Sequence, residues 1–274
     1  MKKRVLKILF YIIGFIWLLI TIYPLLFAIQ TSLKGSTEFF SKLPWSMPSS
    51  LKIQNYVSVL TSEFPRYFLN STIAALVSVC LIMLVASLTG FALAKRDFKF
   101  KKSFFFILLG GLYIPVHITL IPNFILVKNI GLYDTIWALI GPYVAFNLPV
   151  SIVIVTRFME DIPDALIDSA KIDGCSWLGI YFRVAIPLSK SALITLAIYN
   201  SVMVWNEFVY ALVLLSSSKS RTLPLGLWLF QGEYSLNVPV IMAATVLTVL
   251  PLLIIYAIFG ERMISGLTAG AIKK

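Results

Sequence analysis

The sequence predicts an all-α integral membrane protein that crosses the bilayer six times. Of its 274 residues, 59% are hydrophobic and only 13% are charged, and the mean hydropathy is +0.92; soluble domains carry about 25% charged residues. Six apolar runs are long enough to span, because about 20 helical residues cross a hydrocarbon core about 30 Å thick. The runs lack period-2 alternation, so helices are predicted rather than barrel strands. They cover residues 8–30, 69–94, 104–127, 135–156, 191–215 and 238–260.

The connections between these runs divide the chain into three parts. Residues 1–68 hold a basic tail, the first span and a long external segment. Residues 69–260 form a core of five spans with a charged internal connection at 157–190, and residues 261–274 form a tail. The first run is predicted to be a retained helix and not a cleaved signal peptide, because its apolar stretch exceeds the about 7–15 residues typical of such a region.

The net charge of +11 is unevenly distributed between the two sides of the membrane. When the connections are assigned alternately to the two sides, one side receives 16 of the 23 Lys and Arg residues, including those of both chain ends. Basic residues mark the cytoplasmic side of a membrane protein. We therefore expect both termini in the cytoplasm, and the charge implies no nucleic-acid partner.

Polar side chains inside the spans are few, and Glu207 is the one acidic residue among them. An acid near the bilayer centre costs about 2.5–3.5 kcal/mol on insertion scales, so it should face the bundle interior, a cavity or the boundary. Asn200, Met203 and Glu207, at i, i+3 and i+7, would share a helical face that lines a pathway; alternatively, Glu207 simply reaches the interface. The predicted pathway residues are Asn147, Asn200, Met203, Asn206 and Glu207.

Prolines interrupt several of the spans. They would either kink packed helices or let the helices rock, and the sequence leaves both readings open.

Residues 161–190, DIPDALIDSAKIDGCSWLGIYFRVAIPLSK, predict a helix, a sharp turn and a second helix. Pro163 suits a first helical turn, where acidic residues are also favoured. Gly174 stands where a helix C-terminus needs a left-handed residue. Ser176 can cap a second helix that runs to Pro187.

The first of these two helices has a face of small residues beside an acidic one. Ala165, Ser169 and Ile172 share one side, and Asp168 lies on another. A short helix held between two spans suits docking in a groove on another protein. The alternative, a helix resting on the membrane, fits poorly: anionic lipids favour basic helices, whereas residues 160–174 hold five acids against one lysine.

This connection resembles the EAA motif of binding-protein-dependent ABC importer permeases. The motif has an acid and two small residues, then Asp-Gly, nine residues, and an apolar-x-apolar-Pro ending. Asp168 replaces the usual Glu, and Ser169 replaces the first Ala. The segments NYVSVL, FLNS, LPLGLWLFQGEYS, WNEF and GERMISGLTAGAIKK look like the carbohydrate branch of the family, so the resemblance covers nearly all of the chain. The matching residues are Asp168, Ser169, Ala170, Asp173, Gly174, Val184, Ala185, Ile186 and Pro187.

The resemblance implies the transmembrane domain of a type I ABC importer in a bacterial cell membrane. Its partners would be a second homologous permease subunit, two cytoplasmic ATP-binding subunits and an external solute-binding protein that delivers a sugar or oligosaccharide. It places six residues at the ATPase groove: Ala165, Asp168, Ser169, Ala170, Asp173 and Gly174. The loop at Gln231, Gly232, Glu233 and Tyr234 would reach the binding protein, and residues 265–274 would lie along the ATPases.

Two other classes of function are weighed against the importer permease. The sequence has no Gly-rich phosphate loop, so ATP would be hydrolysed by a partner and the chain is not expected to be an enzyme. An ion-coupled secondary transporter usually needs several ionisable residues within its spans, whereas the spans here hold one acid and one histidine. A membrane-embedded enzyme needs a catalytic set, and no carboxylates cluster in the spans. Cys80 and Cys175 fall in separate regions, so no disulfide, metal or cofactor is predicted.

Overall fold

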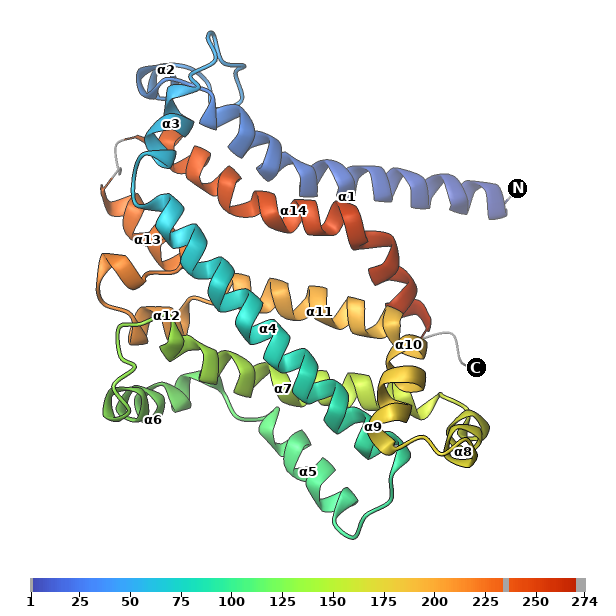
Figure 1. The fold of residues 1–274 in the computed structure, drawn as a ribbon. Coiled ribbons are helices and arrows are strands. Elements are labelled where there is room, and N and C mark those ends of the chain that lie inside the picture. The colour runs from blue at the N-terminus through green and yellow to red at the C-terminus, as the bar shows by residue number, and fades with distance from the viewer. Residues whose placement is uncertain (1, 234–236, 270–274) are drawn as a thin grey trace. The chain divides into compact units, whose positions relative to one another are not determined.

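The computed structural model describes residues 2–233 and 237–269, and every regular element in these ranges is a helix (Figure 1). This confirms the predicted all-α class. The elements are α1 (Lys2–Ser32), α2 (Ser36–Ser41), α3 (Gln54–Leu60), α4 (Phe64–Lys95), α5 (Lys101–Gly111), α6 (Val116–Asn129), α7 (Trp137–Glu160), α8 (Asp164–Ile172), α9 (Trp177–Ile180), the π-helix η1 (Tyr181–Ala185), α10 (Ile186–Leu188), α11 (Lys190–Trp205), α12 (Val209–Leu214), the 3₁₀-helix η2 (Ser218–Ser220), α13 (Leu223–Glu233) and α14 (Val238–Ala269).

Four of the described helices are long and apolar enough to cross a membrane: α1, α4, α7 and α14. Two bent pairs raise the number to six if each pair forms one span. One pair is α5 with α6, bent by 98°, and the other is Trp177–Leu188 with α11, bent by 80°. The number agrees with the six predicted spans, but two of these spans are bent, and the second bent pair covers residues 177–205 and not the predicted run 191–215.

All six predicted runs differ from the helices at one end or both, and three of the differences are large. The run at 104–127 is split between α5 and α6, because Pro115 lacks an N–H and stands just before α6 in an extended conformation. The run at 191–215 is also split, since α11 ends at Trp205 and a separate helix, α12, begins at Val209. The last helix continues to Ala269 instead of ending at 260.

The chain forms two compact units, residues 1–68 with 226–251 and residues 69–225 with 252–274. In the first unit, polar contacts hold the segment after α1. The buried Lys34 ammonium donates to the Pro44 carbonyl at 2.7 Å, and Asn55 Nδ2 donates to the Ser32 carbonyl at 2.7 Å. Hydrogen bonds from buried or half-buried side chains to backbone carbonyls thus fix the segment between α1 and α3.

The second unit is a helical bundle in which α4 packs closely on α7. A Cβ atom at Gly90 would lie 2.8 Å from Val155 Cγ1, so the absence of a side chain sets the distance between these helices. Below this contact an apolar cluster, which includes Phe91, Met159 and Ile180, joins α4 and α7 to the connection that follows α7. The bundle therefore fixes the base of residues 161–190.

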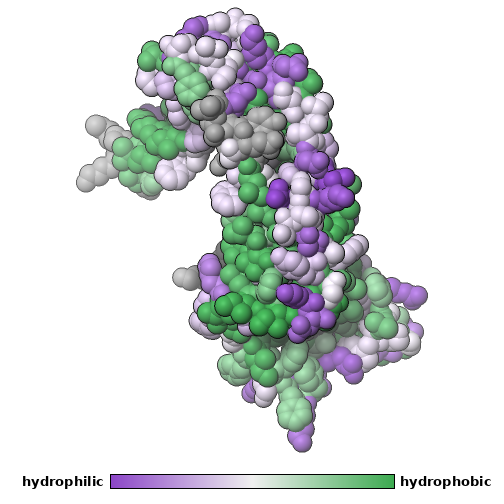
Figure 2. Space-filling view, turned by 90° about the vertical axis from the view of Figure 1, so that its left-hand side faces the viewer, coloured by the Kyte–Doolittle hydropathy of each residue, from purple (hydrophilic) through white to green (hydrophobic). Residues whose placement is uncertain are grey.

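Apolar side chains also cover much of the outer surface, as the green areas of Figure 2 show. On α1, Phe10, Trp17 and Ile20 are all exposed, and none of the apolar window of this helix is buried. Soluble monomers rarely expose contiguous apolar patches of this extent. The described surface is that of a protein in contact with lipid or with other subunits.

Candidate functional site

The short helix α8 is held to the bundle by its inner face. The Ile167 side chain is 2% exposed, and Ala170, one turn further on, is buried beside it. Both belong to the apolar cluster around Phe91 and Met159. Ala170 was predicted among the docking residues; the structure puts its side chain on the inner face, because the i+3 spacing aligns it with Ile167.

The outer face of α8 is free. Ala165, Asp168 and Ser169 are exposed, and the Ile172 side chain is 87% exposed. Asp168 pairs with Lys171 on the same helix at 2.9 Å, which is a surface pair of small energetic weight. Five of the six predicted docking residues are therefore accessible, and sequence reasoning left Ile172, the most exposed apolar residue of the helix, out of the predicted set.

The end of α8 has the geometry that the sequence predicts. Gly174 has φ +77°, a left-handed conformation that side chains disfavour. Its N–H donates to the Lys171 carbonyl at 3.0 Å, and the Cys175 N–H donates to the Ala170 carbonyl at 2.9 Å. These two bonds form a Schellman motif, which satisfies the last carbonyls of the helix and reverses the chain.

The second half of the connection is an irregular helix. Ser176 Oγ accepts from the Gly179 N–H at 3.2 Å and caps α9, as predicted. A π-helical segment then follows from Tyr181 to Ala185, and its Tyr181 hydroxyl lies 2.6 Å from Ser87 Oγ of α4. Segments of π-helix frequently occur at functional sites.

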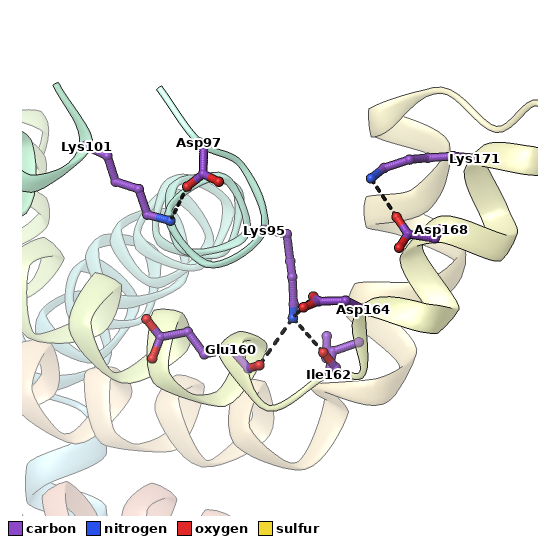
Figure 3. Close-up of polar contacts among 8 residues, drawn as sticks. All are labelled: Lys95, Asp97, Lys101, Glu160, Ile162, Asp164, Asp168 and Lys171. Atoms are coloured by element: carbon purple, nitrogen blue, oxygen red, sulfur yellow. Dashed lines mark hydrogen bonds and ion pairs between the residues drawn. The ribbon is translucent and has the colours of Figure 1, made fainter. Parts of the chain in front are cut away.

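Lys95, the last residue of α4, binds the joint between α7 and α8 (Figure 3). Its ammonium donates to the carbonyls of Glu160 and Ile162 at 3.2 and 2.5 Å and pairs with the Asp164 carboxylate at 2.7 Å. This ammonium holds the pKa of Asp164 below its usual value. Sequence reasoning did not single out Lys95, because a bond between residues 69 positions apart leaves no local pattern.

The predicted pathway face is not formed as expected. Asn200 is fully buried, and its amide donates to Ser151 Oγ of α7 at 3.0 Å and to the Leu196 carbonyl at 2.9 Å. It therefore joins α11 to α7. Met203 is exposed on α11, but this helix ends at Trp205, so the expectation that Glu207 continues the same face is wrong.

Glu207 instead caps the helix that begins after the break. Its carboxylate accepts from the backbone N–H groups of Tyr210 and Ala211 at 2.8 and 3.3 Å, at the start of α12. Of the other predicted pathway residues, Asn147 is half-buried and donates to the Tyr143 carbonyl at 2.8 Å, and Asn206 is exposed. Whether Asn147, Met203, Asn206 and Glu207 line a pathway stays a prediction.

The loop predicted to contact a binding protein is largely helical. Gln231, Gly232 and Glu233 form the end of α13, and Gly232 is exposed. Tyr234 lies outside the described residues, as do the side chains at 231 and 233 and residues 270–274 of the tail.

At the other end of α7, Asp134 joins two loops. It has φ 60°, and its carboxylate accepts from the backbone N–H groups of Ser216 and Ser217 at 2.8 and 2.9 Å and from the Ser220 hydroxyl. Burial opposes ionisation here, but the hydrogen bonds outweigh it and hold the pKa of Asp134 at about 2, below the usual 3.8. Sequence reasoning missed this residue.

Within residues 2–233 and 237–269, no three His, Cys, Asp or Glu side chains are grouped so that they could hold a metal ion. The candidate site is instead the helix α8, whose inner face is buried in the bundle and whose outer face is exposed. A helical bundle with apolar spans that presents such a helix is typical of a membrane transport subunit that works with other proteins.

Comparison with known proteins gives the family. The profile of the binding-protein-dependent transport system inner membrane component family matches residues 85–266, which include α8 and the residues that hold it. The chain belongs to this family and is the membrane permease of an ABC transport system.

Relatives match over nearly the whole chain. A putative ABC transporter permease of Caldicellulosiruptor sp. is 46% identical over 94% of both chains. The arabinooligosaccharides permease AraQ of Halalkalibacterium halodurans is 34% identical over 100% of both chains. The trehalose/maltose permease MalG of Thermococcus litoralis is 34% identical over 100% of this chain and 99% of its own.

Solved structures share the fold. A chain of a bacterial ABC transporter that imports the polysaccharide alginate superposes with a TM-score of 0.82, at 22% identity and over 95% of this chain and 97% of its own. A chain of the alginate transporter in complex with its alginate-bound periplasmic protein gives 0.71, at 16% identity and over 94% and 93% of the two chains. The type I importer fold implied by the sequence is thereby confirmed.

Proposed function

We propose that this chain is one permease subunit of an ATP-driven importer that brings a sugar or oligosaccharide into a bacterial cell. It would form half of the translocation pathway with a second, homologous permease subunit. The names of relatives support the substrate class, since AraQ is named for arabinooligosaccharides and MalG for trehalose and maltose. The identity of the sugar is left open by this spread.

The energy would come from two cytoplasmic ATP-binding subunits through α8. One observation carries this proposal: the inner side of α8 is fixed by Ile167 and Ala170, while Ala165, Ser169 and Ile172 are exposed on a helix outside the predicted spans. An exposed apolar side chain on a helix outside the spans favours a protein groove as its partner. Small residues beside it allow close approach, and the acids around it would orient the contact.

The orientation and the remaining partners follow from the same proposal. The basic side of the membrane, which holds both termini, would be cytoplasmic and would carry α8. An external solute-binding protein would approach from the other side, near Gly232 and its neighbours in α13. A periplasmic binding protein in complex with the alginate transporter supports such a partner.

The chain offers a matched pair of glycines for the test. Gly174 ends α8 with φ +77°, and Gly131 lies in the loop before α7 with φ +73°. A Cβ atom at either position would meet no neighbouring side chain or loop within 4 Å, so the backbone conformation alone resists a substitution. A β-branched residue is disfavoured in this conformation equally at both positions. Valine therefore adds similar backbone strain on the two sides of the protein.

We expect Gly174→Val to abolish ATPase stimulation by the binding protein, because the turn after α8 would change direction, and Gly131→Val to retain most of it. The measurement is the ATP hydrolysis rate of the complete reconstituted complex with and without binding protein, after membrane expression of the subunit is checked. Equal activities of the two variants would contradict the proposal.

A further inference from the structure

The end of α4 forms a charged bond with the joint that carries α8. The Lys95 side chain is only 5% exposed, and the three donors of its ammonium match three acceptors: one on the last residue of α7, one on the turn after it and one on the first residue of α8. Asp164 itself is exposed, so the burial is on the lysine side. A buried charge that has each of its donors used is fixed in direction as well as in position.

We propose that Lys95 is a positioning residue that transmits displacement of α8 to α4. This inference rests on the proposed function, in which α8 follows the ATP-binding subunits. Helix α4 has 32 residues and a length of about 48 Å, so its C-terminal end is a long lever for the rest of the helix. A push on the α7–α8 turn would reach α4 through the Lys95 ammonium.

Apolar packing alone would not perform this task as well. The cluster around Ile167 and Phe91 also connects α8 with α4, but apolar contact is not directional and allows sliding between discrete packings. The hydrogen bonds of Lys95 lose their geometry when either partner rotates. The cluster therefore attaches α8, and Lys95 sets how α4 follows it.

A second contact from the same end of α4 supports the inference. The Arg96 guanidinium lies 4.9 Å from the ring centre of Trp177, and the Lys171 ammonium of α8 lies 5.1 Å from the same ring. Trp177 begins α9, just after the turn at Gly174. Helix α4 thus reaches α8 near its first residue through Lys95 and near its last turn through Arg96 and Trp177.

The space beside this link is hollow. A polar cavity of about 290 Å³ separates α8 from the corner between α4 and α5, and Asp97, Lys101, Asp168 and Lys171 are among its lining residues. Side-chain packing therefore does not join these surfaces along the cavity. The Lys95 side chain crosses from α4 to α8 at its edge (Figure 3).

The neighbouring pair of Lys101 with Asp97 provides the control. Its 3.4 Å contact is of the same chemical type but stays within the α4–α5 corner and involves neither α7 nor α8. Lys95→Met removes the charge at nearly constant volume, Lys95→Arg keeps a cation with several donors, and Lys101→Met removes the control charge. All three are measured in the complete transporter, with the binding protein and ATP-binding subunits, in nanodiscs.

Two readouts separate transmission from folding. The first is the stimulation of ATP hydrolysis by the binding protein; the second is the ATP-dependent change in distance between nitroxide labels on exposed positions of α4 and α11, such as Leu84 and Val202. We expect Lys95→Met to lower the stimulation by about 3- to 30-fold and to reduce the distance change, while the ATP-binding subunits still copurify. Lys95→Arg should restore both readouts, and Lys101→Met should leave them unchanged.

Native stimulation and a native distance change in Lys95→Met would overturn the inference. Loss of the ATP-binding subunits from that variant would also overturn it, because Lys95 would then serve the fold of the docking helix. If Lys95→Met is not produced, failure of Lys95→Arg to support stimulation in an assembled complex decides against the inference. The proposed function is judged separately by the two glycine variants, so either can fail alone.

Discussion

The two ends of α7 are both tied by a charged residue, but the two ties serve different structures. At the end near Glu160, the Lys95 ammonium binds a joint from which α8 extends with an exposed outer face. At the other end, the Asp134 carboxylate is enclosed by backbone N–H groups and a hydroxyl of residues 216–220. The helix between them has 24 residues and is about 36 Å long.

This difference separates a closed contact from an open one. Around Asp134, two backbone N–H groups and a hydroxyl donate to one carboxylate oxygen. On α8 the inner residues Ile167 and Ala170 are buried, whereas Ile172 is 87% exposed and its side chain adds little to the stability of the fold. We therefore expect a partner protein at the end of α7 that carries α8.

The largest effect is expected from the buried isoleucine of α8. Ile167→Ala should lower the stability of the subunit by about 2–4 kcal/mol, because the side chain is 2% exposed in the apolar cluster. The measurement is thermal unfolding in detergent. A loss below about 0.5 kcal/mol would mean that this side chain does not attach α8 to the bundle.

The exposed isoleucine of the same helix should behave in the opposite way. Ile172→Ala is expected to leave thermal stability within about 0.5 kcal/mol of the native subunit. It should weaken binding of the ATP-binding subunits by about 5- to 30-fold, as the loss of an interface anchor does. The measurement is a titration of the purified subunits. Unchanged binding would show that Ile172 is not part of the proposed interface.

The contact at Asp134 should matter for the stability of the subunit and less for the stimulation of ATP hydrolysis. Asp134→Asn keeps the shape and tolerates the left-handed backbone, but it removes the charge that strengthens the bonds from residues 216–220. We expect a loss of about 1–2 kcal/mol in thermal stability. Asp97→Asn, at a fully exposed carboxylate, is the matched control and should change stability by less than about 0.5 kcal/mol.

The smallest expected effect is a pH dependence of the stability difference between the native subunit and Asp134→Asn. The folded pKa of Asp134 is about 2 and its usual value 3.8, so its contribution is present above about pH 4 and is lost as the pH falls toward 2. The stability gap between the native subunit and Asp134→Asn should therefore narrow from pH 5 to pH 3. A gap that stays constant or widens on acidification would show that the Asp134 charge does not stabilise the loops.

Local signals in the sequence were sufficient for the four unbroken spans and for the turn after α8. Run length predicted the spans, and Gly174 and Ser176 marked the turn and the cap because helix ends depend on single residues. The breaks were missed for a different reason. After Asn206 the only local sign of a new helix is Glu207, whose carboxylate accepts from the N–H groups at the start of α12. A single acid inside an apolar run could equally be a pathway residue or an interface residue.

The contacts over long sequence distances could not be predicted from one sequence. Lys95 and Asp134 bind partners 65 to 86 positions away, and neither has a spacing rule that would single it out. Asn200 was read as a pathway residue because a buried amide and a lining amide have the same sequence signature. Only its 3.0 Å bond to Ser151 reveals it as a contact between two helices.

The most direct test of the open end is a photo-crosslink from α8. A benzophenone amino acid at position 172 is compared with one at position 130, since both isoleucines are exposed and Ile172 ends α8, which follows α7, whereas Ile130 directly follows α6, which precedes α7. Irradiation of the complete transporter should give an adduct with an ATP-binding subunit from position 172 and none from position 130. An adduct of position 172 with the binding protein, or an ATP-binding subunit adduct from position 130 alone, would contradict the docking of α8.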